Sequence, residues 1–190
     1  VGSGKTIVAL ISMLNVTKKE FQTALMVPTE ILAIQHFNYF KNLLKNSKIK
    51  IVLLTSKIKK KEKKNILKEI EEGKVDIIIG THALFQDKIK YKNLSYVIID
   101  EQHRFGVHQR LALRDKRRVD SEVPHQLVMT ATPIPRSLTM ALYADMDVSL
   151  IEEMPPGRQA IETVVVPNLR RAEVQARVHK ACVAGRRVYW

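Results

Sequence analysis

The segment of residues 97–101 constrains the possible folds of this chain more than any other part of it. Three apolar β-branched residues, Val97, Ile98 and Ile99, lead directly into two adjacent carboxylates, Asp100 and Glu101. A continuous apolar run is typical of a strand that is buried on both faces of a parallel sheet. Open α/β sheets bind their ligands beyond the carboxyl ends of the strands, so we expect both carboxylates at a ligand-binding edge. At such an edge Asp100 can hold Mg²⁺ and Glu101 can polarise a water molecule.

The first six residues, VGSGKT, supply the phosphate site that this chemistry needs. They match the second half of the P-loop pattern GxxxxGK[ST], in which backbone N–H groups cradle phosphates. An ordinary flexible terminus is the alternative interpretation of these residues taken alone. The residues expected to bind nucleotide are Gly2, Ser3, Gly4, Lys5 and Thr6.

Four other apolar runs predict further strands of the same sheet. They are residues 24–27, 49–54, 75–79 and 126–129, and a last strand is expected at residues 146–151. Helical periodicity predicts helices at residues 6–16, 29–44 and 57–73. The residues expected to face the core are Ile7, Val8, Leu10, Ile11 and Leu14 in the first helix, Ile31, Ile34, Phe37, Phe40 and Leu44 in the second, and Ile58, Ile66, Leu67 and Ile70 in the third. The lysine-rich run at residues 57–64 is interpreted as a solvated helix face.

Three other predicted strand ends carry small or hydroxyl residues that can meet a phosphate backbone. These candidate DNA-binding or coupling residues are Thr29, Gly80, Thr81, His82, Thr130 and Thr132. A glycine permits the close approach of another backbone, and a hydroxyl or a helix N-terminus can bind a phosphate oxygen. Simple structural roles remain open for all of them: a helix cap, a strand-to-helix turn and a proline-containing helix start.

Length and composition bound the organisation of the chain. The 190 residues allow one domain and part of a second. The Pro-Pro-Gly run at residues 155–157 predicts a linker at residues 152–160, between a domain of residues 1–151 and a second at residues 161–190. In the second we expect a strand at residues 161–166, a helix at 168–184 ended by Gly185, and a strand at 186–190.

The net charge of +13 favours a polyanionic partner. Cys182 is the only cysteine, which excludes an intrachain disulfide and favours a reducing compartment. No apolar run approaches the length of a membrane span.

The motifs described above stand in the order of the motifs of superfamily 2 helicases. The amino-acid sequence resembles that of the RecG family of ATP-dependent DNA helicases in four stretches, residues 24–33, 100–107, 129–136 and 153–158. The related transcription-repair coupling factor shares the stretches at residues 103–107 and 130–136, whereas Gln102 and residues 147–158 favour RecG.

This resemblance implies an α/β fold: a RecA-like P-loop NTPase domain with a mostly parallel sheet flanked by helices, truncated at both ends. It implies that ATP and Mg²⁺ are the cofactors and that Lys5 binds the β- and γ-phosphates. It also implies that Thr6 and Asp100 are the ligands of the Mg²⁺ ion. By the same resemblance Glu101 activates the attacking water, Gln102 and His103 relay the nucleotide state, and Thr130 and Thr132 couple it to DNA. Thr29, Gly80 and Thr81 would touch the phosphates of one DNA strand.

The expected function is the remodelling of branched DNA, such as stalled replication forks and Holliday junctions, by a monomer in the bacterial cytoplasm. The family's wedge domain and most of the second motor domain are expected outside these residues, so we expect no useful activity from the 190 residues alone. We also expect the strand that precedes the P-loop to be missing from mid-sheet, which would destabilise the isolated chain. The alternatives are a transcription-repair coupling translocase, a nucleic-acid-binding module without catalysis, and a P-loop ATPase that acts on protein.

Overall fold

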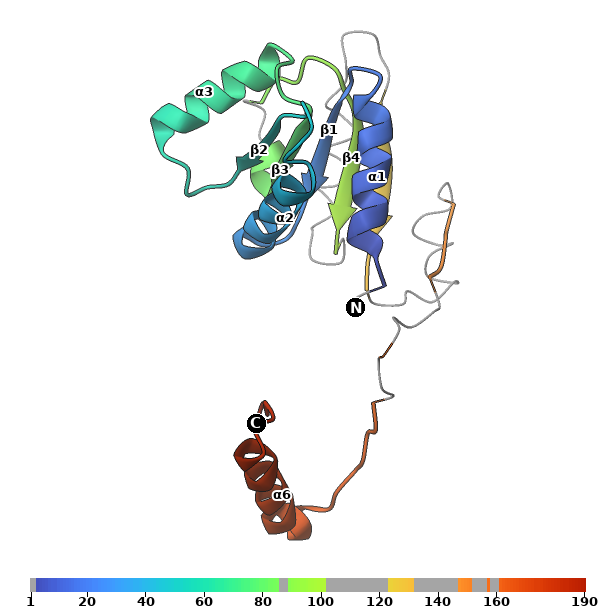
Figure 1. The fold of residues 1–190 in the computed structure, drawn as a ribbon, viewed down its shortest axis with the longest axis vertical. Helices are drawn as coiled ribbons and strands as arrows, with labels where there is room; N and C mark the ends of the chain where they lie inside the picture. Colours follow the sequence, from blue (N-terminus) through green and yellow to red (C-terminus); the bar gives the residue numbers. More distant parts are fainter. Residues whose placement is uncertain (1–2, 86–88, 102–122, 132–146, 152–156, 158–160) are drawn as a thin grey trace. The chain divides into compact units, whose positions relative to one another are not determined.

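The apolar runs of the sequence form the strands of a five-stranded parallel sheet in the computed structural model (Figure 1). The structure describes residues 3–85, 89–101, 123–131, 147–151, 157 and 161–190. The chain divides into two units, Val1–Glu152 and Glu153–Trp190, and the sheet belongs to the first. The strands are β1 (Gln22–Met26), β2 (Ile51–Leu54), β3 (Ile77–Gly80), β4 (Leu94–Asp100) and β5 (His125–Met129).

Neighbouring strands of this sheet are all parallel, in the order β2-β3-β1-β4-β5. The central strand is β1, and all five of its residues are buried. Its Met26 is paired with Gly80 of β3 on one side and with Ile99 of β4 on the other. The strands predicted at residues 24–27, 49–54, 75–79, 97–99 and 126–129 are therefore confirmed, with ends that differ by a few residues.

Alternate residues of the strands face opposite sides of the sheet and build two apolar clusters. The helices that cover them are α1 (Lys5–Thr17), α2 (Glu30–Leu43) and α3 (Lys60–Glu71). Leu25 and Ile79 belong to the cluster that includes residues of α1 and α2, and both helices lie in front of the sheet in Figure 1. Ala24 and Ile78 belong to the other cluster, which includes residues of α3. This layered arrangement confirms the predicted α/β class.

Helix α1 buries a different stripe from the one predicted. Ala9, Leu10 and Met13 are buried against the sheet, and Leu14 is partly buried. The prediction was wrong for three residues that are exposed: Ile7, Val8 and Ile11. With a period of 3.6 residues, a stripe centred on Ala9 and Met13 leaves these three away from the sheet.

Helix α2 shows the same kind of difference. Phe40 is fully buried, and Phe37 and Leu44 pack against its cluster, as predicted. Ile31 and Ile34 were wrongly assigned to the core, because they are 78% and 44% exposed. The buried stripe runs through residues 33, 37, 40 and 44, whose alternating spacing of four and three keeps them on one face of the helix.

Helix α3 buries the face that the sequence predicts, with Ile70 fully buried and Ile66 and Leu67 packed against its cluster. Ile58 packs against the same cluster, from the segment before the helix. Its first residue is Lys60, three residues later than predicted. The helix ends in a Schellman motif, in which Gly73 has φ 74°. The Lys74 N–H donates to the Glu69 carbonyl at 2.9 Å, and the Gly73 N–H donates to the Ile70 carbonyl at 3.1 Å.

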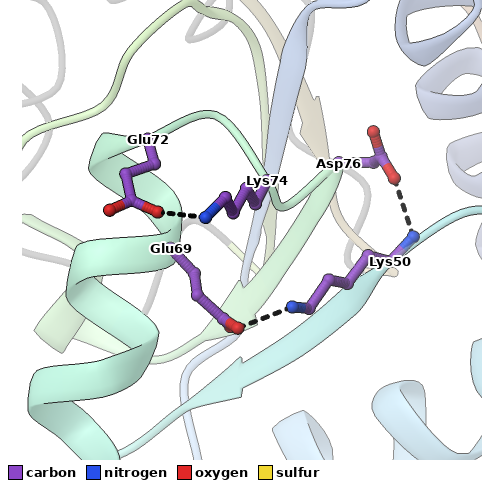
Figure 2. Close-up of polar contacts among 5 residues, drawn as sticks. All are labelled: Lys50, Glu69, Glu72, Lys74 and Asp76. Atoms are coloured by element: carbon purple, nitrogen blue, oxygen red, sulfur yellow. Dashed lines mark hydrogen bonds and ion pairs between the residues drawn. The ribbon is translucent and has the colours of Figure 1, made fainter.

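Charged side chains connect the end of α3 to the starts of β2 and β3 (Figure 2). The Lys50 ammonium lies 2.7 Å from Glu69 Oε1, and the Lys50 N–H donates to Asp76 Oδ2 at 2.7 Å. The Lys74 ammonium lies 2.6 Å from Glu72 Oε2. Its hydrogen bond holds the pKa of the Glu72 carboxyl below the ordinary value. All of these contacts lie at the amino edge of the sheet, opposite to Asp100.

The buried amide of Gln22 joins four segments at the same edge. Its Nε2 donates to the carbonyls of Ile70 and Val75, both at 3.0 Å. Its Oε1 accepts from the N–H groups of Lys92 and Asn93, at 3.0 and 3.2 Å. With only 2% of its surface exposed, Gln22 satisfies backbone groups that no ladder partner reaches.

The described strands pair without interruption from β2 to β5, so β1, β3 and β4 each have a neighbour on both sides. This pairing does not test whether a further strand belongs beside β5, so the expected missing strand and the expected instability of the isolated chain stay predictions. Among the described strands, only β2 and β5 are edges.

The unit Glu153–Trp190 contains a short 3-10 helix, η3 (Asn168–Arg170), followed by helix α6 (Arg171–Val183). Gly185 has φ 76° and donates to the Cys182 carbonyl, which confirms the predicted helix end. The strands expected at residues 161–166 and 186–190 are not formed, and neither are residues 147–151 of the predicted last strand. A strand needs a partner for its ladder groups, and no described residue pairs with these segments. Among the helices of the described ranges, none is long and apolar enough to cross a bilayer.

Candidate functional site

The sequence-predicted site residues gather at one edge of the sheet because the strands are parallel. The carboxyl ends of β1, β3, β4 and β5 lead into Thr29, Gly80, Asp100 and Thr130, respectively. Helix α1 runs back toward the start of β1, so its own first residue, Lys5, lies at this same edge. Figure 1 shows the arrowheads of β1 and β4 pointing toward the end at which α1 begins.

The start of α1 has the features of a phosphate-binding turn. Gly4 precedes the helix with φ 81°, a left-handed conformation that favours glycine. No side chain caps this helix start, and its first turn contains no acidic residue. Its first N–H groups are therefore available to an anion, in keeping with the positive end of the helix dipole. The Lys5 ammonium lies 3.3 Å from Ser3 Oγ, and the next residue, Thr6, is partly exposed.

Glu101 turns sharply out of β4 and contacts the segment after β5. Its φ of 54° is unusual for a residue with a side chain. The Glu101 N–H donates to the Met129 carbonyl at 2.8 Å. Thr130 Oγ1 lies 3.3 Å from Glu101 Oε2, and the Ala131 N–H donates to Oε1 at 3.3 Å. The structure thus brings together the acidic pair and the start of the Thr-Ala-Thr stretch, which lie 29 residues apart.

Asp100 has a contact that the sequence did not predict. His36 Nε2, on the second turn of α2, lies 3.6 Å from Asp100 Oδ2. Both side chains are largely buried, with 12% of His36 and 16% of Asp100 exposed. Helix α2 therefore reaches from the end of β1 to the carboxylate at the end of β4.

The start of α2 is held in two ways. Thr29 is exposed, and its hydroxyl accepts the Leu32 N–H at 3.3 Å, so the helix-cap role is present whether or not Thr29 also contacts a phosphate. Glu30 accepts from Ser56, from the N–H at 3.1 Å and from Oγ at 2.6 Å, and pairs with the Lys57 ammonium at 3.2 Å. The Ser56 hydroxyl, together with Lys57, holds the pKa of the Glu30 carboxyl below its ordinary value.

The segment after β3 gives its three predicted residues different environments. Gly80 is closely packed, since a Cβ there would lie 2.3 Å from the Leu54 carbonyl oxygen. This close approach is to the neighbouring strand β2, and contact of Gly80 with DNA stays a prediction. Thr81 is only 3% exposed, so its side chain is not at the surface, whereas His82 is exposed. Tyr91, whose hydroxyl donates to the Leu84 carbonyl at 3.0 Å, holds the 3-10 turn η1 (His82–Phe85) in place.

Four predicted site residues lie outside the described residues: Gly2, Gln102, His103 and Thr132. Within the described ranges, no group of three or more His, Cys, Asp or Glu side chains could hold a metal ion by itself. A metal at this edge would therefore need the Thr6 hydroxyl and phosphate oxygens as well as Asp100.

Sequence reasoning missed the contacts made by His36, Ser56 and Lys57. His36 stands on an amphipathic helix with no motif around it, and only the strand order brings it to Asp100. Ser56 and Lys57 belong to a stretch whose lysines indicate a solvated face. The one signal in the sequence for the contacts of Ser56 and Lys57 is Glu30 itself. A carboxylate at a helix start favours nearby N–H donors and cations.

Comparison with known protein families gives a match over most of the chain. The profile described as DEAD/DEAH box helicase matches residues 1–141. Among curated proteins, the chain is 52% identical to the ATP-dependent DNA helicase RecG of Pasteurella multocida and 53% identical to that of Haemophilus influenzae, over the whole chain in both cases. The chain spans 28% of the length of each of these relatives. The predicted resemblance to RecG is confirmed.

Solved structures agree with this match. A structure of RecG bound to a three-way DNA junction superposes with a TM-score of 0.82 at 43% identity, over 97% of this chain and 24% of that chain. The helicase MrfA superposes with a TM-score of 0.60 over 74% of this chain and 25% of its own, at 20% identity, a likeness that concerns the fold alone. The expected RecA-like helicase fold is therefore confirmed.

Proposed function

We propose that this chain, which belongs to the DEAD/DEAH box helicase family, is the ATP-hydrolysing motor segment of a DNA helicase that remodels branched DNA. The observation that carries the proposal is the meeting, at one sheet edge, of an uncapped helix start and the Asp100–Glu101 pair. The first can bind phosphates and the second can bind a metal and orient water, which is the division of labour that phosphoryl transfer needs.

The residues present fit Mg²⁺ and ATP. The free N–H groups at the start of α1 and the Lys5 ammonium suit a polyphosphate, and hard oxygen ligands from Thr6 and Asp100 suit Mg²⁺. When bound, ATP supplies the phosphoryl group for transfer to water. Glu101 would orient that water as a general base, with Gln102 and His103 nearby in the sequence to relay the nucleotide state.

The contact between Glu101 and Thr130 suggests how hydrolysis is coupled to nucleic acid. Because both Glu101 oxygens face Thr130 and Ala131, a change in the carboxylate environment acts directly on this segment. Thr132 follows it in the sequence. We infer that Thr130 and Thr132 transmit the state of the nucleotide to the DNA-facing surface.

The DNA-facing surface is assigned to the ends of β1 and β3. Thr29 and His82 are exposed there and can meet a phosphate backbone. The buried Thr81 and the closely packed Gly80 would act by shaping the turn, with backbone groups as their contacts. The net charge of +13 favours a polyanion. The similar RecG structure is bound to a three-way DNA junction, which supports branched DNA as the substrate.

We further propose that residues 1–151 form the first motor domain, residues 152–160 a linker and residues 161–190 the start of a second motor domain, and that the whole protein acts as a monomer in the bacterial cytoplasm. A motor of this type hydrolyses ATP between two such domains, so the activity belongs to the whole protein. The transcription-repair coupling translocase is the nearest alternative, and the RecG relatives favour the branched-DNA helicase over it. A non-catalytic DNA-binding module would not need Lys5 and the acidic pair together. An ATPase that acts on protein would leave the Gly80–His82 and Thr130–Thr132 stretches without a use.

The proposal is tested by substituting Lys5 and Glu101 in the whole protein. Lys5→Ala should abolish both nucleotide binding and DNA-stimulated ATP hydrolysis, because Lys5 meets the phosphates in the ground state. Glu101→Gln should abolish hydrolysis and leave binding largely intact, because Glu101 acts on the water. Normal turnover by Glu101→Gln, measured as phosphate release with a fluorescent ADP analogue as the binding control, would contradict the catalytic assignment.

The coupling role is tested separately by combining Thr130→Ala with Thr132→Ala. If these residues couple the site to DNA, the double variant should keep much of its ATP hydrolysis and lose the separation of strands at a DNA junction. A structural turn would instead give a parallel fall in both activities that follows the loss of thermal stability.

A further inference from the structure

His36 is the residue of the described chain that contacts the candidate metal ligand and has no place in the proposed mechanism. Its Nε2 lies 3.6 Å from Asp100 Oδ2. This separation is within ion-pair range but longer than a hydrogen bond, and a movement of about 0.5 Å would make a normal N–H···O contact. Both side chains are largely shielded from water, so the interaction is weakened less by solvent than one at the surface.

The imidazole ring also packs against an aromatic side chain. Phe40, one turn later on the same helix and fully buried, meets the ring edge-on with 6.1 Å between centroids and 64° between planes. Helix α2 is fixed at its start by the Thr29 cap and by the bonds from Ser56 to Glu30. His36 is therefore a ring whose position is set by packing and whose nitrogen faces the carboxylate.

We propose that His36 is a positioning residue that orients the Asp100 carboxylate for Mg²⁺. The proposal rests on the proposed function, in which Asp100 is a ligand of the metal that accompanies ATP. A metal-binding carboxylate is commonly oriented by a partner in its outer shell, and loss of such a partner weakens metal binding. Contact with Nε2 restricts rotation of the carboxylate about its last torsion, so Asp100 is already oriented before the metal arrives.

The position of His36 on α2 adds a consequence for regulation. The helix begins next to Thr29, the proposed DNA contact, and His36 lies seven residues further along. These seven residues span about 10 Å of helix, and we expect the helix to move as a rigid unit. Any shift of α2 when DNA binds at Thr29 therefore changes the distance between His36 and Asp100, and with it the affinity for the metal.

Two substitutions distinguish the effect of losing the N–H donor from the effect of losing the aromatic ring. His36→Phe keeps an aromatic ring against Phe40 and removes the nitrogen, whereas His36→Gln supplies an N–H at a similar reach and removes the ring. The measurement is Mn²⁺ binding to the whole protein in the presence of ADP, followed by electron paramagnetic resonance, which needs no turnover. Thr6→Ala serves as a positive control for lost metal binding.

We expect His36→Phe to weaken Mn²⁺ binding by about tenfold, and His36→Gln to stay within about threefold of the unchanged protein. The metal concentration for half-maximal ATP hydrolysis should rise in His36→Phe, while the rate at saturating metal changes little. Unchanged Mn²⁺ affinity in a folded His36→Phe protein would overturn the proposal, and so would equal weakening in both variants. If His36→Phe unfolds, His36→Leu takes its place.

Absence of Mn²⁺–ADP binding in the unchanged protein would refute the proposed function itself, whereas normal binding there with unaffected variants would refute the role of His36 alone.

Discussion

Replacement of Gln22 by leucine should be one of the most destabilising changes in the first unit, although Gln22 lies far from the candidate site. Its amide makes four hydrogen bonds to backbone groups of α3 and of the segments before β3 and before β4. A net value of about 1 kcal/mol for each would give a loss of about 4 kcal/mol. The expected loss of stability is smaller than this sum, because some of the four partner groups find another hydrogen bond when the amide is removed.

The Ile70 carbonyl also accepts the Gly73 N–H at 3.1 Å, so it keeps a partner. The N–H groups of Lys92 and Asn93 are only partly buried, and water can replace the amide oxygen there. The Val75 carbonyl is left unpaired among the described residues, at a cost of about 1–3 kcal/mol. We therefore expect Gln22→Leu to lower the free energy of unfolding by about 3 kcal/mol, which corresponds to a fall in Tm of about 6–12 °C.

Urea and thermal unfolding followed by circular dichroism measure this difference. Gln35→Leu is the matched control, since Gln35 is exposed on α2 and should change stability by no more than about 0.5 kcal/mol. Gln22→Glu keeps the shape but places a carboxylate oxygen against the Ile70 and Val75 carbonyls, so at pH 7 it should be at least as destabilising as Gln22→Leu. A Gln22→Leu protein as stable as the Gln35→Leu control would show that the hydrogen bonds of the Gln22 amide do not stabilise the fold.

Two other predictions concern the segments around the site. Gly80→Ala should destabilise the protein by about 1–3 kcal/mol, because its Cβ would lie 2.3 Å from the Leu54 carbonyl oxygen, and a stability within about 0.5 kcal/mol of the unchanged protein would contradict the close packing. The pKa of Glu30 is lowered in the folded protein, so its bonds to Ser56 and Lys57 stabilise the fold above the ordinary value of 4.5 and are lost as the pH falls through the folded value. The Ser56 amide resonance should therefore move in an NMR titration whose midpoint lies below pH 4.5, and movement centred near neutral pH would show that another group controls this segment.

The sequence predicts the strands of the first unit well because each is a short apolar run bounded by polar residues. The helix faces are less predictable. Ile31 and Ile34 are apolar at helical spacing, yet they are exposed because the helix turns residues 33, 37 and 40 toward the sheet. The spacing of apolar residues allows several possible buried faces of a helix, and packing against a particular neighbour determines which face is buried.

Strand order is the information that a single sequence does not contain. The Asp100–Glu101 pair and Thr130 could each be placed at a strand end from residue patterns alone. Their contact depends on β5 lying beside β4, and the contact of His36 depends on α2 reaching across the end of β1. The strands expected at residues 161–166 and 186–190 fail for a related reason, because an apolar run becomes a strand only where a partner completes its hydrogen bonds.

We propose that the whole protein, of which this chain is a motor segment, couples ATP hydrolysis to branched DNA. Its rate of hydrolysis on different nucleic acids tests this proposal most directly. The assay compares a three-way DNA junction, a linear duplex of the same base composition and an RNA duplex of matching sequence, with Mg²⁺ and ATP at saturation. We expect the junction to stimulate hydrolysis most, its strands to be separated, and both effects to vanish in Glu101→Gln. Hydrolysis that no DNA stimulates, or that RNA stimulates as strongly as the junction does, would contradict the proposal.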